Sequence, residues 1–418
     1  MKQTVLCPAV GEYDDPFNQK QGVLTIPLSK EGNCLVFGAT GNGKTTFATT
    51  LCYSLIKNHT PDEVNLYLMD YGSETLKAFA SAPHVGGIVT ASENEKCVNL
   101  LKMLLKEMET RRSLFSSFGG DYASYCKASG KTVPNIVVVL NNFSGFAEQM
   151  EDYQEEFALL TRDGVKYGIH FVVTATHTNA VRYRVQQNFK MLLTMQLNDA
   201  TDYVTIVGKN DGAIPSKFKG RGLVALDRVY EFQTAYCTED QDTQGFIRKF
   251  CEEVRANTTK AAKPIPILPQ VVDMEFVERK IDGLASIPVG VAKNSLEIIT
   301  FNLEKKVVLP VLSQDTHEIV DFIEELIPII ARGCQVTLVD TENELDGCES
   351  YKTKQKVADV VLEMFNEMVL RNNQYKDANM DSSVLEQYDE RCYVIFGVKR
   401  LFEQLNDDGR DKLATLFD

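Results

Sequence analysis

The stretch that decides the fold is GATGNGKTTF, residues 38–47, which follows the apolar run CLVF (34–37) and precedes ATTLCYSLIKN (48–58). It matches the pattern GxxxxGK[ST] between a strand and a helix, in which backbone N–H groups surround a phosphate at the helix N-terminus. Lys44 would neutralise the β- and γ-phosphates, and Thr45 would offer its hydroxyl to Mg2+. We therefore predict that ATP and Mg2+ bind here. The predicted nucleotide-binding residues are Gly38, Ala39, Thr40, Gly41, Asn42, Gly43, Lys44, Thr45 and Thr46, with Thr45 as the metal ligand.

Strand-like and helix-like segments alternate beyond this motif. Helices are expected after residue 43, from about residue 93 and from about residue 242, and a hairpin is expected from GRGLVAL (220–226) and VYEFQTAYC (229–237). Such alternation is typical of a parallel sheet covered by helices on both faces. We predict an α/β fold with a central, mainly parallel sheet. The expected parallel strands are residues 33–37, 64–70, 135–140 and 170–176.

A proline-rich segment interrupts the pattern after the last of these helices. Pro264, Pro266 and Pro269 in RANTTKAAKPIPILPQ are incompatible with regular structure. We therefore place a linker at residues 259–272. It separates a first module, residues 1–258, from a second module, residues 273–418.

The second module repeats the order of the first. GNCLVFGATGNGKTTF aligns with KKVVLPVLSQDTHEIV, VNLYLMDYGSETL with CQVTLVDTENEL, KEMETRRSLF with NEMVLRNNQY, and NIVVVLNNFSGF with RCYVIFGVKRLF. This indicates tandem domains. The second copy has no glycine or lysine in PVLSQDTH, has Asp315 where a phosphate would lie, and is shorter after its last strand. We predict that it is degenerate and incomplete, and that it serves in contacts rather than in chemistry.

The strand IVVVL ends in Asn141 and Asn142. P-loop enzymes commonly place an aspartate at such a strand end to hold the magnesium shell, and one large branch adds a glutamate that polarises water. An amide carries no charge and cannot accept a proton at neutral pH, so binding with slow turnover is expected. Asparagine is also common at strand-to-loop corners. Asp70, which ends another apolar strand, is the alternative magnesium ligand.

Other polar residues have two interpretations each. Thr174, Thr176 and His177 end a strand where they could sense the γ-phosphate, or could form an internally satisfied polar cluster. Four arginines could reach the nucleotide of a neighbouring subunit, or could serve in surface contacts and packing. These are Arg162, Arg182, Arg184 and Arg221, of which Arg162 and Arg221 join Asn141 and Asn142 as the weak catalytic candidates.

The composition narrows the class of protein. The chain has 418 residues, a net charge of −14 and no apolar run long enough to span a bilayer. A net negative charge disfavours binding to a nucleic acid backbone. The ten cysteines never occur as CxxC, which indicates reduced core residues. No signal peptide is recognisable at the start, MKQTVLCPAVGEYDDP, so we expect a cytosolic protein or a fragment.

Several separated motifs together resemble a known family. With DDPFNQKQ (14–21), GATGNGKTTF, DGVKYGIHFVVTATHT (163–178) and IPSKFKGRGLVAL (214–226) in this order, the first module resembles the FtsK/SpoIIIE ATPases, and within them the type VII secretion branch, EssC/EccC. The resemblance weakens over residues 265–418. It implies tandem P-loop NTPase domains of the RecA-like or FtsK-like type, two adjacent modules from the C-terminal end of a longer protein.

The resemblance also implies a setting. The modules would work at the cytoplasmic face of the cell membrane, to which a part outside this chain would anchor them. They would assist export of small helical-hairpin proteins and contact other secretion components, and the last module would recognise substrates. The full-length protein could form a homo-hexamer. Two alternatives stay open. One is a DNA-translocating motor, and the other is a competent ATP hydrolase whose acid is not Asn141 or Asn142.

Overall fold

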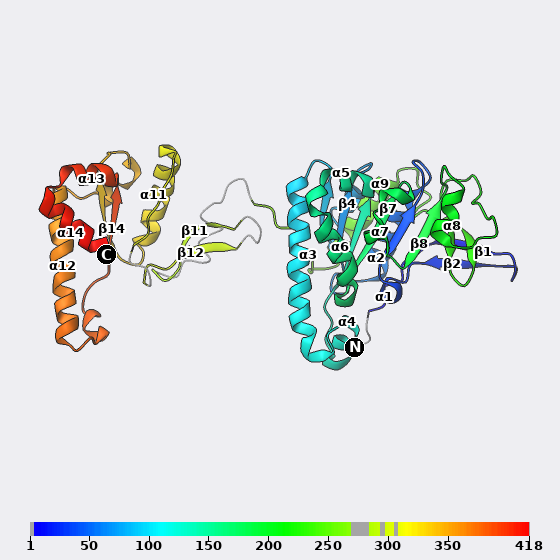
Figure 1. Cartoon of the computed structure of the whole chain (residues 1–418), viewed down its shortest axis with the longest axis horizontal. Helices are drawn as coiled ribbons and strands as arrows, with labels where there is room; N and C mark the ends of the chain where they lie inside the picture. The colour runs from blue at the N-terminus through cyan, green and yellow to red at the C-terminus, as the bar shows by residue number, and fades with distance from the viewer. Residues whose placement is uncertain (1–3, 269–283, 293–296, 305–307, 418) are drawn as a thin grey trace. The chain divides into compact units, whose positions relative to one another are not determined.

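The computed structural model describes residues 4–268, 284–292, 297–304 and 308–417. The chain divides into two compact units, Met1–Ile267 and Leu268–Asp418, which run from blue to green and from yellow to red in Figure 1. The boundary falls inside the predicted linker, 259–272, of which residues 269–272 lie outside the described residues.

A ten-stranded sheet forms the centre of the first unit, in the order β2-β1-β10-β9-β8-β3-β7-β6-β4-β5. Along this order, the pairs from β8 to β5 are parallel, and the pairs from β2 to β8 are antiparallel. The predicted mainly parallel α/β sheet is therefore confirmed. The strands are β1 Ala9–Asp15, β2 Lys20–Thr25, β3 Cys34–Phe37, β4 Val64–Asp70, β5 Val85–Thr90, β6 Asn135–Asn141, β7 Ile169–Ala175, β8 Met191–Met195, β9 Arg221–Ala225 and β10 Val229–Thr234.

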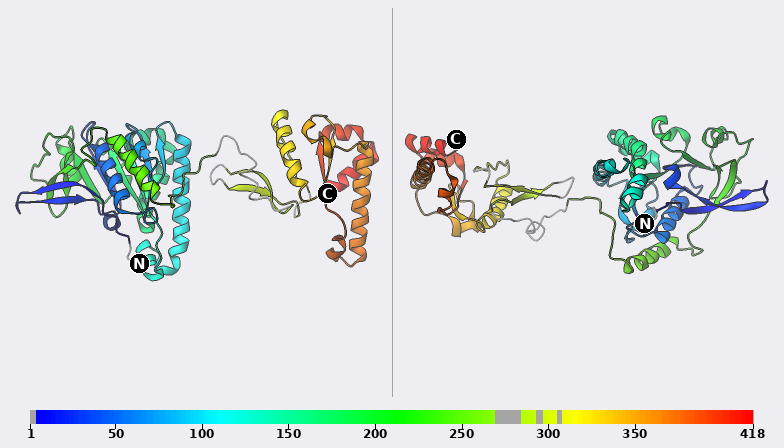
Figure 2. Two further views of the ribbon diagram at one scale, coloured as in Figure 1. Left: turned by 180° about the vertical axis from the view of Figure 1, so that it is seen from behind. Right: turned by 90° about the horizontal axis from the view of Figure 1, so that it is seen from below.

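Helices cover both faces of this sheet. Because side chains alternate along a strand, Leu35 and Phe37 of β3 join the core under α3 and α6, whereas Cys34 and Val36 join the core under α2 and α9. In Figures 1 and 2 the hairpin of β1 and β2 projects from the end of the unit opposite α3. The helices are α1 Leu28–Glu31, α2 Lys44–Asn58, α3 Asn94–Phe115, α4 Tyr122–Ser129, α5 Phe143–Gln149, α6 Gln154–Asp163, α7 Tyr183–Gln186, α8 Thr201–Val207 and α9 Thr243–Ala256.

The first residues of the predicted linker pack against the first unit. The backbone N–H of Ile265 donates to the carbonyl of Gly86 (3.0 Å), and the hydroxyl of Tyr67 donates to the carbonyl of Lys263 (2.8 Å). The side chain of Ile265 is buried beside Gly87, where a Cβ would meet it at 2.5 Å. This segment covers the exposed edge of β5 and belongs structurally to the first unit.

The described residues of the second unit form two small sheets. The first is the antiparallel pair β11 Ile287–Val291 and β12 Ile298–Phe301, and the second is the parallel pair β13 Gln335–Asp340 and β14 Arg391–Phe396. The helices pack against these strands. They are α11 Thr316–Ile330, α12 Val357–Asp377, α13 Val398–Gln404 and α14 Asp407–Phe417.

The predicted repeat is only partly reproduced in the second unit. β13 and β14 pair in parallel as β4 and β6 do, but the register differs from the alignment by one residue. Asp70 is paired with Asn141, and Asp340 is paired with Phe396. Phe396 therefore takes the place of Asn141, whereas the alignment put Gly397 there.

The expected counterpart of the P-loop strand is absent among the described residues. Residues 308–315 form no strand, and residues 305–307 lie outside the described part. In the first unit this strand is held by β7 and β8, whereas no described strand follows β14. Without parallel neighbours, Val308 and Leu312 stay exposed. The strand that the alignment predicts at residues 307–310 is therefore wrong for residues 308–310, the part of it that the structure describes.

Candidate nucleotide-binding site

The P-loop joins β3 to α2 at the carboxyl edge of the sheet. The N–H of Gly38 donates to the carbonyl of Ala175 at the end of β7 (3.0 Å), and the N–H of Ala39 donates to the carbonyl of Gln196 after β8 (2.8 Å). Gly43 caps α2 with a φ of 100°, a conformation that favours glycine. The loop is thus fixed to both neighbouring strands before any ligand binds.

Lys44 lies folded over this loop. Its Nζ donates to the carbonyls of Gly38 (2.6 Å) and Ala39 (3.0 Å). Burial lowers the pKa of the Lys44 ammonium, because desolvation disfavours the charged form. An anion in the loop would restore the lost solvation, so the geometry suits a phosphate ligand.

The P-loop lines one side of a pocket of about 360 Å3. Its residues there are Gly41, Gly43, Lys44, Thr45 and Thr46. The other side was not predicted from the sequence and comes from the start of β9 and the end of β10. The residues of this side are Lys219, Gly220, Gln233, Thr234 and Tyr236.

Asn141 lies at the end of β6, close to Thr45. Its Nδ2 donates to Oδ1 of Asp70 (2.9 Å) and lies 3.4 Å from Oγ1 of Thr45, and its Oδ1 accepts from the hydroxyl of Thr174 (2.9 Å). Because a carboxylate only accepts, the amide nitrogen must face Asp70 and Thr45. Mg2+ and its water shell require oxygen acceptors. The structure therefore presents a donor where a magnesium aspartate would present acceptors.

Asn142 is also occupied by local contacts. It has a φ of 71°, its N–H donates to the hydroxyl of Thr174 (2.9 Å), and its Nδ2 donates to the carbonyl of Tyr71 (2.9 Å). The predicted polar cluster at the end of β7 is thus partly assembled. Thr174 binds both asparagines, Thr176 lies 3.5 Å from the hydroxyl of Ser144, and His177 is exposed.

Asp70 closes the turn that follows β4. Its Oδ1 accepts from the N–H of Gly72 and its Oδ2 from the N–H of Leu76, both at 3.1 Å. Asp340 has the same function after β13, where it accepts from the N–H groups of Asn343 and Leu345. Because both oxygens of Asp70 are engaged and the side chain is fully buried, the carboxylate acts as a structural cap.

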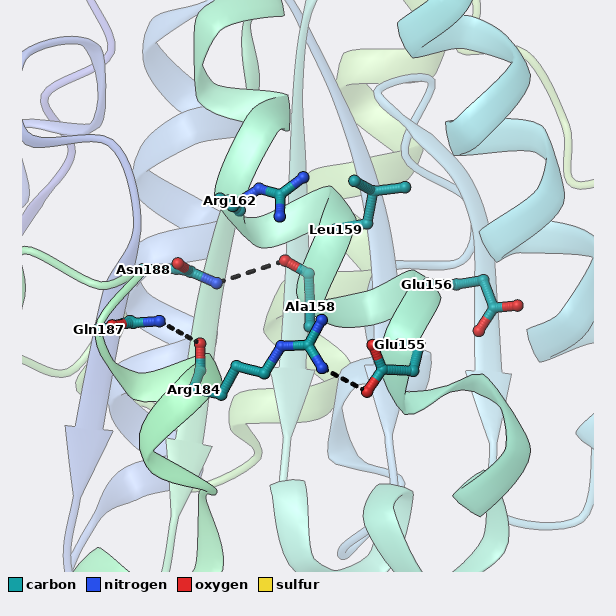
Figure 3. A pocket seen from close by; sticks show the side chains of 8 residues that line it. All are labelled: Glu155, Glu156, Ala158, Leu159, Arg162, Arg184, Gln187 and Asn188. Carbon is teal, nitrogen blue, oxygen red and sulfur yellow. Dashed lines mark hydrogen bonds and ion pairs between the residues drawn. The ribbon is translucent and has the colours of Figure 1, made fainter.

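The arginine candidates lie in different places. Arg162 binds Asp163 through two bonds of 2.8 Å and lines a separate pocket of about 340 Å3 between α6 and α7, where Arg184 pairs with Glu155 (Figure 3). Arg182 is exposed at the start of α7. Arg221 follows Gly220 at the nucleotide pocket, and its Nη1 donates to Asp14 (3.2 Å). Within the described residues, only Arg221 of the four is adjacent to a residue that lines this pocket.

The residues fit a triphosphate better than a metal ion. The loop supplies backbone N–H groups and an ammonium, whereas Thr45 supplies the one hydroxyl predicted for Mg2+. No group of three or more histidine, cysteine, aspartate and glutamate side chains in the described part of the chain could hold a metal ion. Any Mg2+ here would depend on Thr45 and on the phosphate oxygens.

A glycine-rich loop between a buried parallel strand and a helix, with a second strand end beside its threonine, defines a P-loop nucleotide-binding domain. The family follows from the comparison of sequences. Residues 4–210 match the FtsK/SpoIIIE family, so this part of the chain is an FtsK/SpoIIIE domain. The predicted resemblance is confirmed.

The chain is similar over almost its whole length to type VII secretion proteins. It is 24% identical to EssC of Staphylococcus aureus strain MRSA252 and 25% identical to YukB of Bacillus subtilis strain 168, over 98% and 96% of this chain. In each case it spans 28% of the relative's length.

Solved structures of the same kind share the fold. EssC (ATPases 2 and 3) from Geobacillus thermodenitrificans has a TM-score of 0.79, with 20% identity over 95% of this chain and 85% of that one. EccC (ATPases 2 and 3) from Thermomonospora curvata, in complex with a signal sequence peptide, has a TM-score of 0.64, with 22% identity over 98% of this chain and 78% of that one. Within the described residues, no helix is long and apolar enough to cross a membrane.

Proposed function

We propose that the first unit binds Mg-ATP and hydrolyses it slowly or not at all, as the nucleotide-binding part of a type VII secretion ATPase. The observation that carries this proposal is an intact phosphate cradle beside the uncharged Asn141. Lys44 and the loop glycines meet the requirements of binding, and Asn141 and Asn142 supply neither a metal carboxylate nor a general base.

Hydrolysis through another acid is the alternative. The geometry disfavours Asp70 in this role, because its oxygens accept from Gly72, Leu76 and Asn141. The acid would then come from a neighbouring module, and steady-state phosphate release by the chain discriminates between the two hypotheses. Turnover of about 1 per second or faster would favour the alternative.

Binding itself is tested by titration of ATP with Mg2+ in a calorimeter. The wild-type chain should bind, and Lys44→Ala should lose binding while it keeps its unfolding temperature, because the hydrogen bonds of the Lys44 ammonium are made to carbonyls of the P-loop itself. Lys57→Ala, at the other end of α2, is the matched control and should bind as the wild type does. Equal binding by Lys44→Ala would reject the site.

The second unit is proposed to recognise a substrate or partner protein. Asp315 caps α11 and accepts from the N–H groups of His317 and Glu318, so a carboxylate occupies the helix end where a phosphate would bind. Phe396 stands in the register position of Asn141. The EccC relative was solved with a signal sequence peptide, which supports a secreted protein of the helical-hairpin kind as the ligand. Mixing the chain with a substrate of its own secretion system, and measuring affinity with and without ATP, tests this role.

The wider setting is also proposed. The chain would work at the cytoplasmic face of the membrane, joined to membrane-anchored parts and other secretion components, and the full-length protein could form a homo-hexamer. DNA translocation is disfavoured by the net charge of −14. Tight, salt-sensitive binding of duplex DNA would overturn that preference.

A further inference from the structure

The side of the nucleotide pocket opposite the P-loop has no role in the phosphate chemistry described above. It is formed by the loop before β9 and by the end of β10, and it includes Lys219, Thr234 and Tyr236. A triphosphate in the loop would occupy the half of the pocket at Lys44 and Thr45. The remaining half is available to the nucleoside.

This wall is firmly attached to the P-loop. The N–H of Gly220 donates to the carbonyl of Asn42 (3.1 Å), and the N–H of Thr234 donates to the carbonyl of Gly220 (2.8 Å). The hydroxyl of Thr50, in α2, donates to the carbonyl of Ala235 (2.6 Å). These bonds fix the backbone on both sides of Thr234. The wall is therefore held at a set distance from the P-loop even when no ligand is bound.

Two side chains of the wall lack an explanation within the protein. Thr234 is only 3% exposed, and its hydroxyl has no hydrogen-bond partner among the described residues. Such buried, unsatisfied groups are uncommon and call for a partner. Tyr236, two residues further, is 68% exposed beside the same pocket. A buried hydroxyl and an exposed aromatic ring on one wall are what a nucleoside requires.

We infer that Tyr236 and Thr234 form the nucleoside half of the site, with the ring of Tyr236 stacked on the base and the hydroxyl of Thr234 hydrogen-bonded to the nucleoside. This inference rests on the proposed binding of ATP to the P-loop. Stacking suits the position, because every base offers a π-face to an aromatic ring. Lys219, on the same wall, adds a positive charge close to the phosphates.

The experiment compares ATP with inorganic tripolyphosphate, which shares the phosphates and lacks the nucleoside. Tyr236→Ala should bind ATP about tenfold more weakly and tripolyphosphate unchanged, and Tyr236→Phe should restore ATP binding. Tyr183→Ala, which removes an exposed tyrosine of α7 outside the pocket, is the matched control and should leave both affinities unchanged.

A spectroscopic arm tests the stacking directly. The chain has no tryptophan, so Tyr236→Trp creates a single reporter, whose fluorescence should be quenched by ATP and not by tripolyphosphate. The inference would be overturned if Tyr236→Ala bound ATP as tightly as the wild type does, or if it lost equal affinity for ATP and for tripolyphosphate. Lys44→Ala tests the P-loop independently of this result. A wild-type chain that binds neither ligand would overturn the proposed function as well.

Discussion

The carboxamide of Asn141 lies between Thr45 and Asp70, 3.4 Å from the hydroxyl of the first and 2.9 Å from Oδ1 of the second. The amide of Asn141 explains why the buried carboxylate of Asp70 does not face the nucleotide. Asp70 needs a donor on that side, because it is fully buried, and Asn141 supplies it. The amide at position 141 is thus coupled to the turn after β4.

Asn141→Asp is expected to destabilise the first unit. Two buried carboxylates at this distance cannot both be ionised, so the free energy of unfolding should fall by about 2–4 kcal/mol at pH 8. The shared proton raises the pKa of one carboxyl, so the loss is full above that pKa and shrinks as the pH falls through it. Urea unfolding at pH 8 and pH 5.5 measures this, and equal stability to the wild type at both pH values would contradict it.

The exchange Asp70→Asn with Asn141→Asp is the matched control. It keeps one carboxylate and one amide, and it loses only one of the backbone bonds from Gly72 and Leu76, at a cost of about 1 kcal/mol. We expect ATP binding to become more dependent on Mg2+. Phosphate release should rise only when Asn142→Glu is added, since the exchange supplies a metal ligand and no base.

The predictable part of the fold is the part that is buried on both faces. The apolar runs of β3 and β6 are fully buried, so their sequences identify them as central parallel strands. β1, with the sequence AVGEYDD, is partly exposed and mixes acidic with apolar residues, and its strand pattern is therefore weak. For this reason neither β1 nor β2 was predicted from the sequence.

The site divides in the same way. The P-loop could be located because it directly follows the central strand β3, and Asn141 because it is the last residue of the central strand β6. Thr234 and Tyr236 could not, because antiparallel pairing of β9 with β8 and β10 brings them to the P-loop from far along the chain. Nothing in the local sequence VYEFQTAYC points to a phosphate loop.

Gly220→Ala should damage both stability and ATP binding. Gly220 has a φ of 83°, and a Cβ there would lie 2.8 Å from Nε2 of Gln233. The added methyl group would therefore strain the backbone by about 1–2 kcal/mol and displace the pocket wall formed by the loop before β9 and the end of β10. Gly212→Ala is the matched control, since it has a φ of 82° with no atom within 4 Å. The unfolding temperature should fall in both variants, whereas the affinity for ATP should fall only in Gly220→Ala. Equal affinities in the two variants would argue against a wall coupled to the P-loop.

The site should distinguish poorly between ATP and GTP. Gln233 carries the one side-chain amide that lines the pocket, and its Nε2 already donates to the carbonyls of Lys219 and Thr234. Stacking on Tyr236 tolerates any base. We expect dissociation constants within about fivefold of each other, or about 1 kcal/mol. Competition between the two nucleotides, read from the Tyr236→Trp fluorescence, measures the ratio. A preference above about a hundredfold would mean that another group reads the base edge.

His170, within β7, should make the first unit sensitive to mild acid. Burial lowers the pKa of the His170 imidazole to about 4, so the folded state binds fewer protons than the unfolded state between about pH 4 and 6.5, and stability falls as the pH falls through this range. The contribution of His170 between pH 7 and pH 5 is about 2 kcal/mol. Burial also lowers the pKa values of His59 and His84, so the free energy of unfolding of the wild type should fall by more than this.

Urea unfolding at pH 7 and pH 5 measures the effect. The decrease in the free energy of unfolding should be about 2 kcal/mol smaller in His170→Gln than in the wild type. His317 is an exposed residue of the second unit, so His317→Gln should leave the pH dependence of the wild type unchanged. An unaltered pH dependence in His170→Gln would show that the imidazole does not titrate as its burial requires.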